Sequence, residues 1–246
     1  MLNFLLLPTL RSFINIFFLL VISTTSLLAQ QDSVKKPVDS LRWKKFRPTG
    51  VRFGTDVISI IKSSSVKTFS GWEANMDVDF NRYYLAVDYG KWARTYDSDA
   101  GSYSNDGSYW RAGIDVNFLT KDPEKNMFFF GARYANSSFS EDAIVVVNDE
   151  LWGGNTEALS NPGMKAHWFE LTTGLRVKMW RFFWMGYTAR FKFGLKTDES
   201  GVMLASDVPG YGRADGQSYW GFNYQLLFRI PIMKDRAVQT TDTKAK

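Results

Sequence analysis

A few residues in this sequence could do chemistry, and the single histidine, His167, is the first to consider. An imidazole is the side chain most often used as a general base, and a nucleophilic mechanism would pair it with a serine within hydrogen-bond reach. The neighbours of His167 are instead Trp168 and Phe169, and Ser160 or Ser218 could approach it only through loops. An aromatic setting therefore favours a structural histidine.

Two acidic motifs are also candidates. Asp77 and Asp79 could act as general acid and base, but buried arginine partners are the better explanation for such a pair. The stretch DSDAGSYSNDG, residues 97–107, approximates a calcium loop, yet Gly101 and Ser108 stand where that loop needs an oxygen ligand and a glutamate. We predict no catalytic residue, no cofactor and no metal site.

Composition narrows the class of protein. The 246 residues include no cysteine, which excludes disulfides, thiol catalysis and cysteine-based zinc sites. The net charge is only +5, and aromatic residues make up 16% of the chain, which favours strands. A mean hydropathy of −0.23 excludes a polytopic helical membrane protein, and nothing predicts a nucleic-acid partner.

The chain begins with a segment typical of a secretory signal peptide. An apolar core at 13–22 precedes small and polar residues, and cleavage is expected near Ala29. We therefore divide the chain into a signal peptide (1–29), a periplasmic tail (30–48), a β-barrel (49–233) and a polar periplasmic tail (234–246). Both tails are polar and charged.

Period-two alternation is the strongest signal in the remaining sequence. Residues 72–80, 183–196 and 220–232 place apolar side chains on one face and polar ones on the other. Five further segments follow the rule less strictly: 51–61, 83–89, 110–118, 128–134 and 169–179. We predict an all-β, eight-stranded antiparallel up-and-down transmembrane barrel, apolar toward lipid. Ten strands are the alternative, if Ala143–Val147 forms half of an extra hairpin.

The expected strands also place aromatic residues at both rims, as in membrane barrels. One rim would collect Trp72, Trp92, Trp110 and Trp220, and the other Phe80, Tyr83, Phe118, Phe128 and Phe183. Connections near 81–82, 120–126 and 180–182 are short, whereas 97–108, 137–165 and 197–217 would be long loops. Outer-membrane barrels keep short turns on the periplasmic side, so both termini should be periplasmic in a Gram-negative outer membrane.

An eight-stranded barrel is filled by its own side chains, so the inward charges must pair. The predicted lumen network comprises Arg52, Glu73, Asp77, Asp88, Arg111, Asp115, Arg133, Glu170, Arg176, Arg190 and Arg229. A diffusion pore would need a wider barrel. Near one turn, Trp180, Phe182, Trp184 and Met185 put apolar side chains on both strand faces, which suggests either a docking surface for a partner or a hydrophobic floor for the lumen.

The QQDS start at Gln30, the eight predicted strands and the polar tail after IPIMK (230–234) together resemble a small outer-membrane barrel family of the Bacteroidota, classed as a domain of unknown function. The resemblance implies association with a surface lipoprotein and with the barrel-assembly machinery, and no catalytic residue carries over. Segments 32–34 and 39–41 resemble the O-glycosylation signal of that phylum, which would modify Ser33 and Ser40.

Three hypotheses follow. The leading one is a non-enzymatic accessory or structural subunit of an outer-membrane complex, in contact with outer-membrane lipids and lipopolysaccharide. The second is a lipid-modifying enzyme that uses His167. The third is a passive structural barrel.

Overall fold

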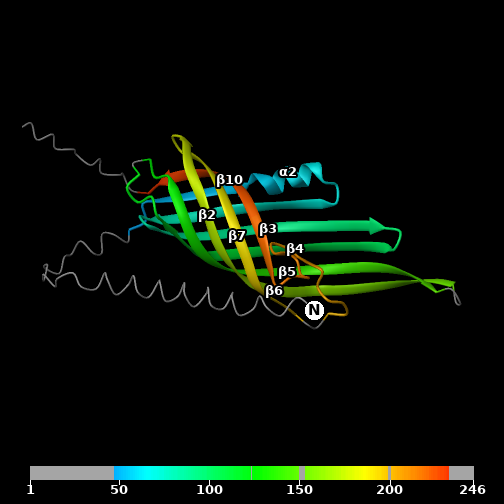
Figure 1. Cartoon of the computed structure of the whole chain (residues 1–246). Helices are drawn as coiled ribbons and strands as arrows, with labels where there is room; N and C mark the ends of the chain where they lie inside the picture. Colours follow the sequence, from blue (N-terminus) through cyan, green and yellow to red (C-terminus); the bar gives the residue numbers. More distant parts are fainter. Residues whose placement is uncertain (1–46, 123, 150–152, 199–200, 233–246) are drawn as a thin grey trace, which may run out of the picture. The chain divides into compact units, whose positions relative to one another are not determined.

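The main feature of the computed structural model, which describes residues 47–122, 124–149, 153–198 and 201–232, is one antiparallel sheet bent into a ring (Figure 1). Eight strands each pair with two neighbours, and the first strand pairs with both the second and the last. The predicted all-β class and the eight strands of the ring are confirmed. Among the described residues, no helix is long and apolar enough to cross a bilayer.

The elements follow one another around the ring in chain order. The ring strands are β1 (Gly50–Asp56), β2 (Phe69–Phe80), β3 (Tyr83–Ser98), β4 (Gly101–Asn117), β5 (Met127–Asp149), β6 (Gly153–Trp180), β7 (Phe183–Thr197) and β10 (Ser218–Pro231). The helix α2 (Val57–Ser65) follows β1, and two short strands, β8 (Asp207–Val208) and β9 (Gly212–Arg213), pair with each other before β10.

Side chains alternate between the inside and the outside of the ring, as a pleated strand requires. In β2, Glu73 and Asp77 are buried inside, whereas Trp72 and Met76 are exposed outside. The same partition holds around the ring, with Ile114, Leu171 and other large apolar side chains on the outer wall. The outer wall is therefore apolar, whereas the interior holds the buried charges together with two buried hydrophobic clusters.

The strand expected at 51–61 ends early. Asp56 caps a helix at this point, because its carboxylate accepts hydrogen bonds from the backbone N–H of Ser59 at 3.1 Å and from the Ser59 hydroxyl at 2.6 Å. The following sequence, VISIIKSSS, is rich in β-branched residues, which is why alternation and propensity favoured a strand. The cap and the packing of α2 against β2 and β10 override that preference.

Two of the three expected long loops are wrong. Residues 97–108 and 137–165 extend strands: β3 and β4 pair as far as Ser98 and Gly101, and β5 and β6 as far as Asp149 and Gly153. Ala143–Val147 continues β5, so it adds no further strand to the ring. Most of these two segments lack a regular alternation of apolar and polar residues, so the sequence pattern did not predict strands there.

Aromatic side chains gather at two levels of the outer wall. Trp72, Trp110 and Trp220 are exposed there, but Trp92 is not on this belt. It lies on the inner face, with ring centroids 5.8 Å from Phe69 and 6.3 Å from Tyr109. The reason is parity, since β3 points its odd-numbered residues outward. Ring contacts link the belt through the pairs Trp72–Tyr89, Trp110–Tyr134, Tyr134–Phe169, Phe169–Phe193 and Phe191–Trp220.

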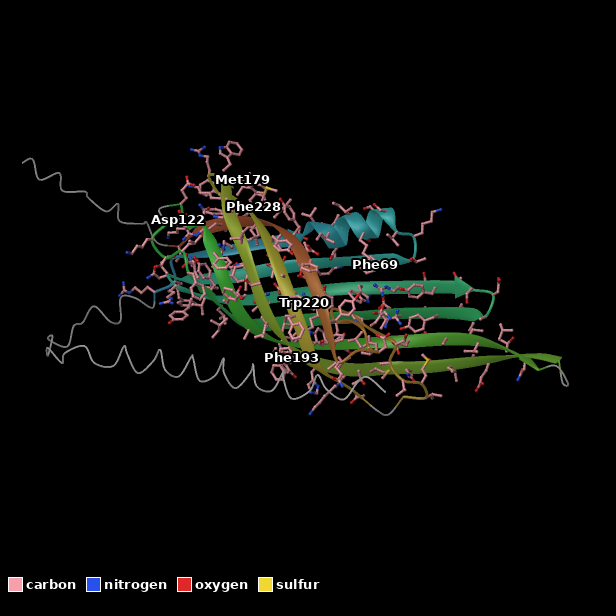
Figure 2. The ribbon with its side chains drawn as sticks, in the orientation of Figure 1. Phe69, Asp122, Met179, Phe193, Trp220 and Phe228 are labelled. Atoms are coloured by element: carbon pink, nitrogen blue, oxygen red, sulfur yellow. The ribbon has the colours of Figure 1, made fainter. Side chains whose placement is uncertain are left out.

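The two rims of the ring differ. The turn rim carries the connections 81–82, 118–126 and 181–182 together with both ends of the sheet, where Gly50 pairs with Pro231. The loop rim, at the other end, carries α2, the β3–β4 and β5–β6 hairpins and the segment 201–217. Figure 2 shows Asp122 and Met179 at the turn rim and Trp220 and Phe193 farther along the wall.

Candidate functional site

The interior of the ring holds five arginines and five carboxylates in one ion-paired network. Each is at most 3% exposed, and together they come from strands β1 to β7. Equal numbers of opposite charges satisfy the condition for burying ions, which is that each finds a partner. The members are Arg52, Arg111, Arg133, Arg176 and Arg190 with Glu73, Asp77, Asp88, Asp115 and Glu170.

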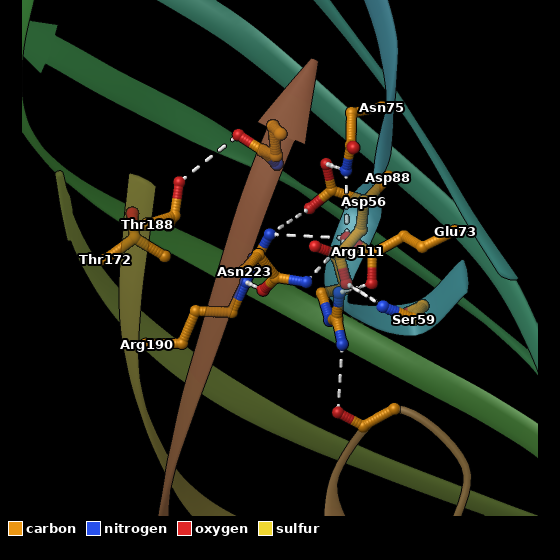
Figure 3. Close-up of polar contacts among 12 residues, drawn as sticks. Asp56, Ser59, Glu73, Asn75, Asp88, Arg111, Thr172, Thr188, Arg190 and Asn223 are labelled. Carbon is orange, nitrogen blue, oxygen red and sulfur yellow. Dashed lines mark hydrogen bonds and ion pairs between the residues drawn. The ribbon is translucent and has the colours of Figure 1, made fainter. Parts of the chain in front are cut away.

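Arg190 of β7 is the centre of this network (Figure 3). Its Nη1 lies 3.0 Å from Oε2 of Glu170, its Nη2 lies 3.0 Å from Oδ2 of Asp88, and its Nε donates to Oδ1 of Asn223 at 2.6 Å. Arg111 then joins Glu73 at 2.7 Å to the same Glu170 at 3.0 Å. The Arg190 guanidinium therefore ties β7 to β3, β6 and β10 across the lumen.

Toward the turn rim the network continues through shared carboxylates. Arg133 pairs with Asp88 and, at 2.9 Å, with Asp115. Arg176 lies 3.5 Å from Asp115 and 2.6 Å from Asp77. Arg52 completes the chain at 2.8 Å from the other oxygen of Asp77. Each of these charges thus has its partner on another strand.

Arg229, the remaining predicted member of the lumen network, lies outside this series of ion pairs. Its Nη2 lies 3.1 Å from Oδ2 of Asp79, which also accepts a hydrogen bond from the hydroxyl of Thr49 at 2.6 Å. The pair joins β10 to β2 beside the turn rim. Asp77 and Asp79, the candidate acid/base pair, therefore lie against arginines rather than against each other.

A hydrophobic layer lies beneath the network at the turn rim. Met127 and Phe129 are fully buried with Tyr84, and the Arg52 and Arg176 guanidiniums stack 4.5 and 4.8 Å from the rings of Tyr84 and Phe129. The interior is thus packed by its own side chains.

The predicted docking group divides between the two faces of β7 and its turn. Trp184 is only 3% exposed and points into the lumen, so it cannot contact a partner. Its even number places it on the inner face, opposite Leu227, which is also buried. Trp180 and Phe182 are 74% and 58% exposed at the turn, and Met185 is half-buried on the outer wall.

The β6–β7 hairpin projects beyond its neighbour at the turn rim. Strand β5 begins at Met127, which pairs with Arg176, so the β6 backbone beyond Lys178 has no β5 partner in the described register. The projecting tip carries Met179, Trp180 and Phe182, all more than half exposed. These three large apolar side chains flank the exposed Arg181, and an exposed group of this kind marks a contact surface for a protein or a membrane.

At the loop rim, residues 201–217 fold back into the mouth of the ring. Val208 and Tyr211 are fully buried, and the ring of Tyr211 lies edge-on to Trp168 at 5.5 Å. Glu141 holds the loop backbone, because its Oε1 accepts hydrogen bonds from the N–H groups of Ser206 and Asp207, both at 3.1 Å. The segment acts as a plug above the charge network.

Further polar contacts fix the plug. Asp207 lies 2.6 Å from Nη1 of Arg94, and the Nζ of Lys192 donates to the carbonyls of Gly210 and Tyr211 at 2.7 and 2.8 Å. Burial raises the pKa of Asp207 above its ordinary value; Arg94 opposes that rise and Glu141 adds to it. The plug therefore packs more readily with this carboxyl protonated.

His167 lies on the outer wall between β5 and β7. Its cross-strand neighbours are Asn136 and Lys196, and its ring centroid is 6.2 Å from that of Tyr134. Within the described ranges, the structure brings no serine hydroxyl into hydrogen-bond contact with His167. The histidine belongs to the aromatic belt.

The predicted calcium-like loop and the predicted glycosylation sites remain to be placed. Residues 97–107 form the tip of the β3–β4 hairpin, and no cluster of three or more potential metal ligands occurs in the part of the chain that the structure describes. Ser33 and Ser40 lie outside the described residues, as do the expected signal peptide and the 234–246 tail.

The sequence patterns did not predict several interior residues of this site. Asn223 shares the inner face of β10 with Arg229, so the alternation already contained its signal. Glu141 continues the inward series of β5 beyond Arg133, but the segment was expected to be a loop. The burial of Asp207 had no signal, because it depends on a loop that folds back.

The strand pairing and the division of side chains define a class of protein, an eight-stranded antiparallel β-barrel with an apolar outer wall and an ion-paired interior. The model of the DUF6048 family, a domain of unknown function, matches residues 9–235, and the chain belongs to that family. None of the curated proteins matches the chain. The solved structure of Acinetobacter baumannii CarO is similar at 10% identity and a TM-score of 0.38, over 75% of this chain and 98% of that one.

Proposed function

We propose that this protein is a non-enzymatic integral outer-membrane β-barrel that serves as an accessory or structural subunit of an outer-membrane complex, in outer-membrane protein assembly or envelope biogenesis. Its turn rim and both termini face the periplasm, and its outer wall contacts outer-membrane lipids and lipopolysaccharide. The observation that carries the subunit role is the projecting apolar tip of the β6–β7 hairpin, formed by Met179, Trp180 and Phe182.

The outer wall supports the membrane part of the proposal. Large apolar side chains such as Ile114, Leu171 and Phe222 are each more than half exposed on it. A water-soluble protein rarely exposes so extended an apolar surface, whereas a membrane barrel requires an apolar band between aromatic belts. Short connections on the termini's rim favour the periplasmic placement of that rim.

The filled lumen supports a role other than transport. The charge network, the hydrophobic layer beneath it and the plug above it occupy the interior. An eight-stranded barrel has little space beyond its own side chains. The paired state of the interior carboxylates also supports a non-catalytic role, since proton transfer needs a carboxyl that is free to titrate.

The projecting tip supports a protein partner. Lipid-facing aromatics sit on one face of a strand, but Trp180 and Phe182 stand at the end of a hairpin beyond the β5 backbone. Trp is enriched in the anchors of protein interfaces, and aromatic anchors often carry most of the binding energy. The partner we propose is an outer-membrane lipoprotein or a barrel-assembly complex.

A native pull-down of the tagged protein from outer membranes in mild detergent tests this function. We expect a partner to be recovered in a fixed ratio. We expect the double variant Trp180→Ala/Phe182→Ala to bind that partner more weakly, by about 2 kcal/mol or more. Trp110→Ala is the matched control, because Trp110 is also an exposed belt residue but lies away from the tip. Recovery of the wild-type barrel alone would contradict the subunit role.

A further inference from the structure

The barrel wall has a gap that α2 fills. Strand β1 stops at Asp56, opposite Gln225 of β10, and its last partner in β2 is Ala74. Toward the loop rim, therefore, residues 69–73 of β2 and 218–224 of β10 have no strand between them. The helix α2 lies against both strands in this place, as Figure 1 shows.

Side chains, rather than a strand ladder, hold the helix to these edges. The N–H of Tyr224 donates to Oδ1 of Asp56 at 2.9 Å, and the N–H of Gly71 donates to Oγ of Ser63 at 3.2 Å. The gap lies at the level of the aromatic belt, because Trp72 and Trp220 lie on its two edges. Strand edges at this depth are tolerated where they line protein or a polar cavity.

A cavity of about 190 Å³ occupies the gap. Its lining includes Arg111 and Lys192, which are buried in the lumen, and Ile58 and Phe222, which are exposed on the outer wall. The cavity is thus lined by residues of both the lumen and the outer wall. It is smaller than the roughly 300–1,000 Å³ of pockets that enclose a whole drug-sized ligand, so it suits one small group of a larger molecule.

Around this cavity, the positive charges outnumber the negative charges that could pair with them. Glu73 pairs with Arg111, and Asp56 is occupied as the cap of α2. Lys62 and Lys192, in contrast, have no carboxylate within ion-pair distance among the described residues.

The two lysines also keep donors free. The Nζ of Lys192 donates to two backbone carbonyls, and that of Lys62 lies 4.2 Å from the centre of the Phe69 ring. An ammonium has three donors, so each lysine retains at least one for an anion.

We propose that this wall cavity binds the phosphate of an anionic membrane-lipid head group, with Lys62 and Lys192 as its ligands. The acyl chains would remain outside, against Ile58 and Phe222, at the depth where lipid head groups meet an aromatic belt. The inference rests on the membrane placement proposed above, but not on the subunit role. Charge-assisted contacts from two lysines would supply both affinity and selectivity for the phosphate.

Native mass spectrometry of the full-length protein, folded in a nonionic detergent, tests the proposal. The probes are phosphatidylglycerol, a diacylglycerol with the same chains, and inorganic phosphate. We expect phosphatidylglycerol to bind at least about tenfold more tightly than either other probe, because only it presents a phosphate and chains together. Insertion of the same protein into vesicles, measured separately, distinguishes a failed lipid site from a failed membrane placement.

Substitutions locate the site. Lys62→Gln should weaken phosphatidylglycerol binding about tenfold, as should Lys192→Gln. Lys91→Gln and Lys165→Gln are the controls, because both lysines are exposed at the same rim outside the cavity. Lys62 is only half-buried on α2, so its variant remains informative if the buried Lys192 variant does not fold.

Two outcomes would overturn the proposal. If Lys62→Gln binds phosphatidylglycerol as wild type does, or no more weakly than the control variants, the cavity is not the lipid site. If inorganic phosphate binds as tightly as phosphatidylglycerol, the cavity is a site for a soluble anion instead.

Discussion

The two ends of the lumen are built in different ways. In the charge network, every member lies on a ring strand, and arginines and carboxylates are equal in number and share partners. At the loop rim, the interior is completed by α2 and by the 201–217 plug, and Lys62 and Lys192 face a cavity without a carboxylate partner. The network is a structural core, whereas the loop rim holds the plug and the proposed lipid-binding cavity.

The largest expected effect breaks the network at its centre. Arg190→Met leaves the buried Asp88 and Glu170 with one arginine fewer, and we expect a loss of about 3–5 kcal/mol in the free energy of unfolding. Urea unfolding of the protein in vesicles, followed by tryptophan fluorescence, measures it. Arg82→Met at an exposed turn should change stability by less than about 0.5 kcal/mol. Equal losses in the two variants would refute the distinction.

A substitution at Glu141 should have a smaller effect and release the plug without unfolding the barrel. Glu141→Ala removes the acceptor for the N–H groups of Ser206 and Asp207, and we expect plug packing to weaken by about 1–3 kcal/mol. Trypsin cleavage after Arg213 should accelerate while the urea midpoint changes little. Glu157→Ala, at an exposed strand position, serves as the control. A matching fall in the urea midpoint would mean that plug and network are one cooperative unit.

The mouth should also respond to pH through Asp207. Since its pKa in the folded protein is raised above the unfolded value, proton binding favours the packed plug. Packing should be strongest below about pH 4, near the unfolded pKa, and weaken as pH rises through the folded pKa. Hydrogen exchange at residues 206–212, corrected for intrinsic rates, measures this. Asp207→Asn should remove the dependence, and its persistence in that variant would exclude Asp207 as the cause.

The smallest effect should come from an ion pair in solvent. Lys91 and Asp106 lie 3.2 Å apart on the outside near the loop rim, each more than half exposed. Lys91→Ala should change stability by less than about 1 kcal/mol. The same urea titration compares it with Arg190→Met. A loss as large as that of the buried arginine would mean that burial does not separate the two kinds of pair.

The alternation of the sequence determined the ring strands, their number and the side on which most charges lie. Alternation is local, since each residue's face follows from its distance in sequence from its neighbours. It failed where local chemistry competed, as at Asp56, whose cap turns a β-branched segment into α2. It also failed at 137–165, where a strand pair carries polar residues on both faces.

Only the tertiary structure decided which charges meet. Arg190 and Asp88 are 102 positions apart, and their contact depends on strand register and on the ring that brings β7 across the lumen from β3. The plug and the wall gap are equally nonlocal, since Asp207 is buried by Arg94 and Glu141, and the cavity joins α2 to β10. A sequence pattern fixes the face on which a side chain lies, whereas the partner it finds there depends on how the whole sheet closes around it.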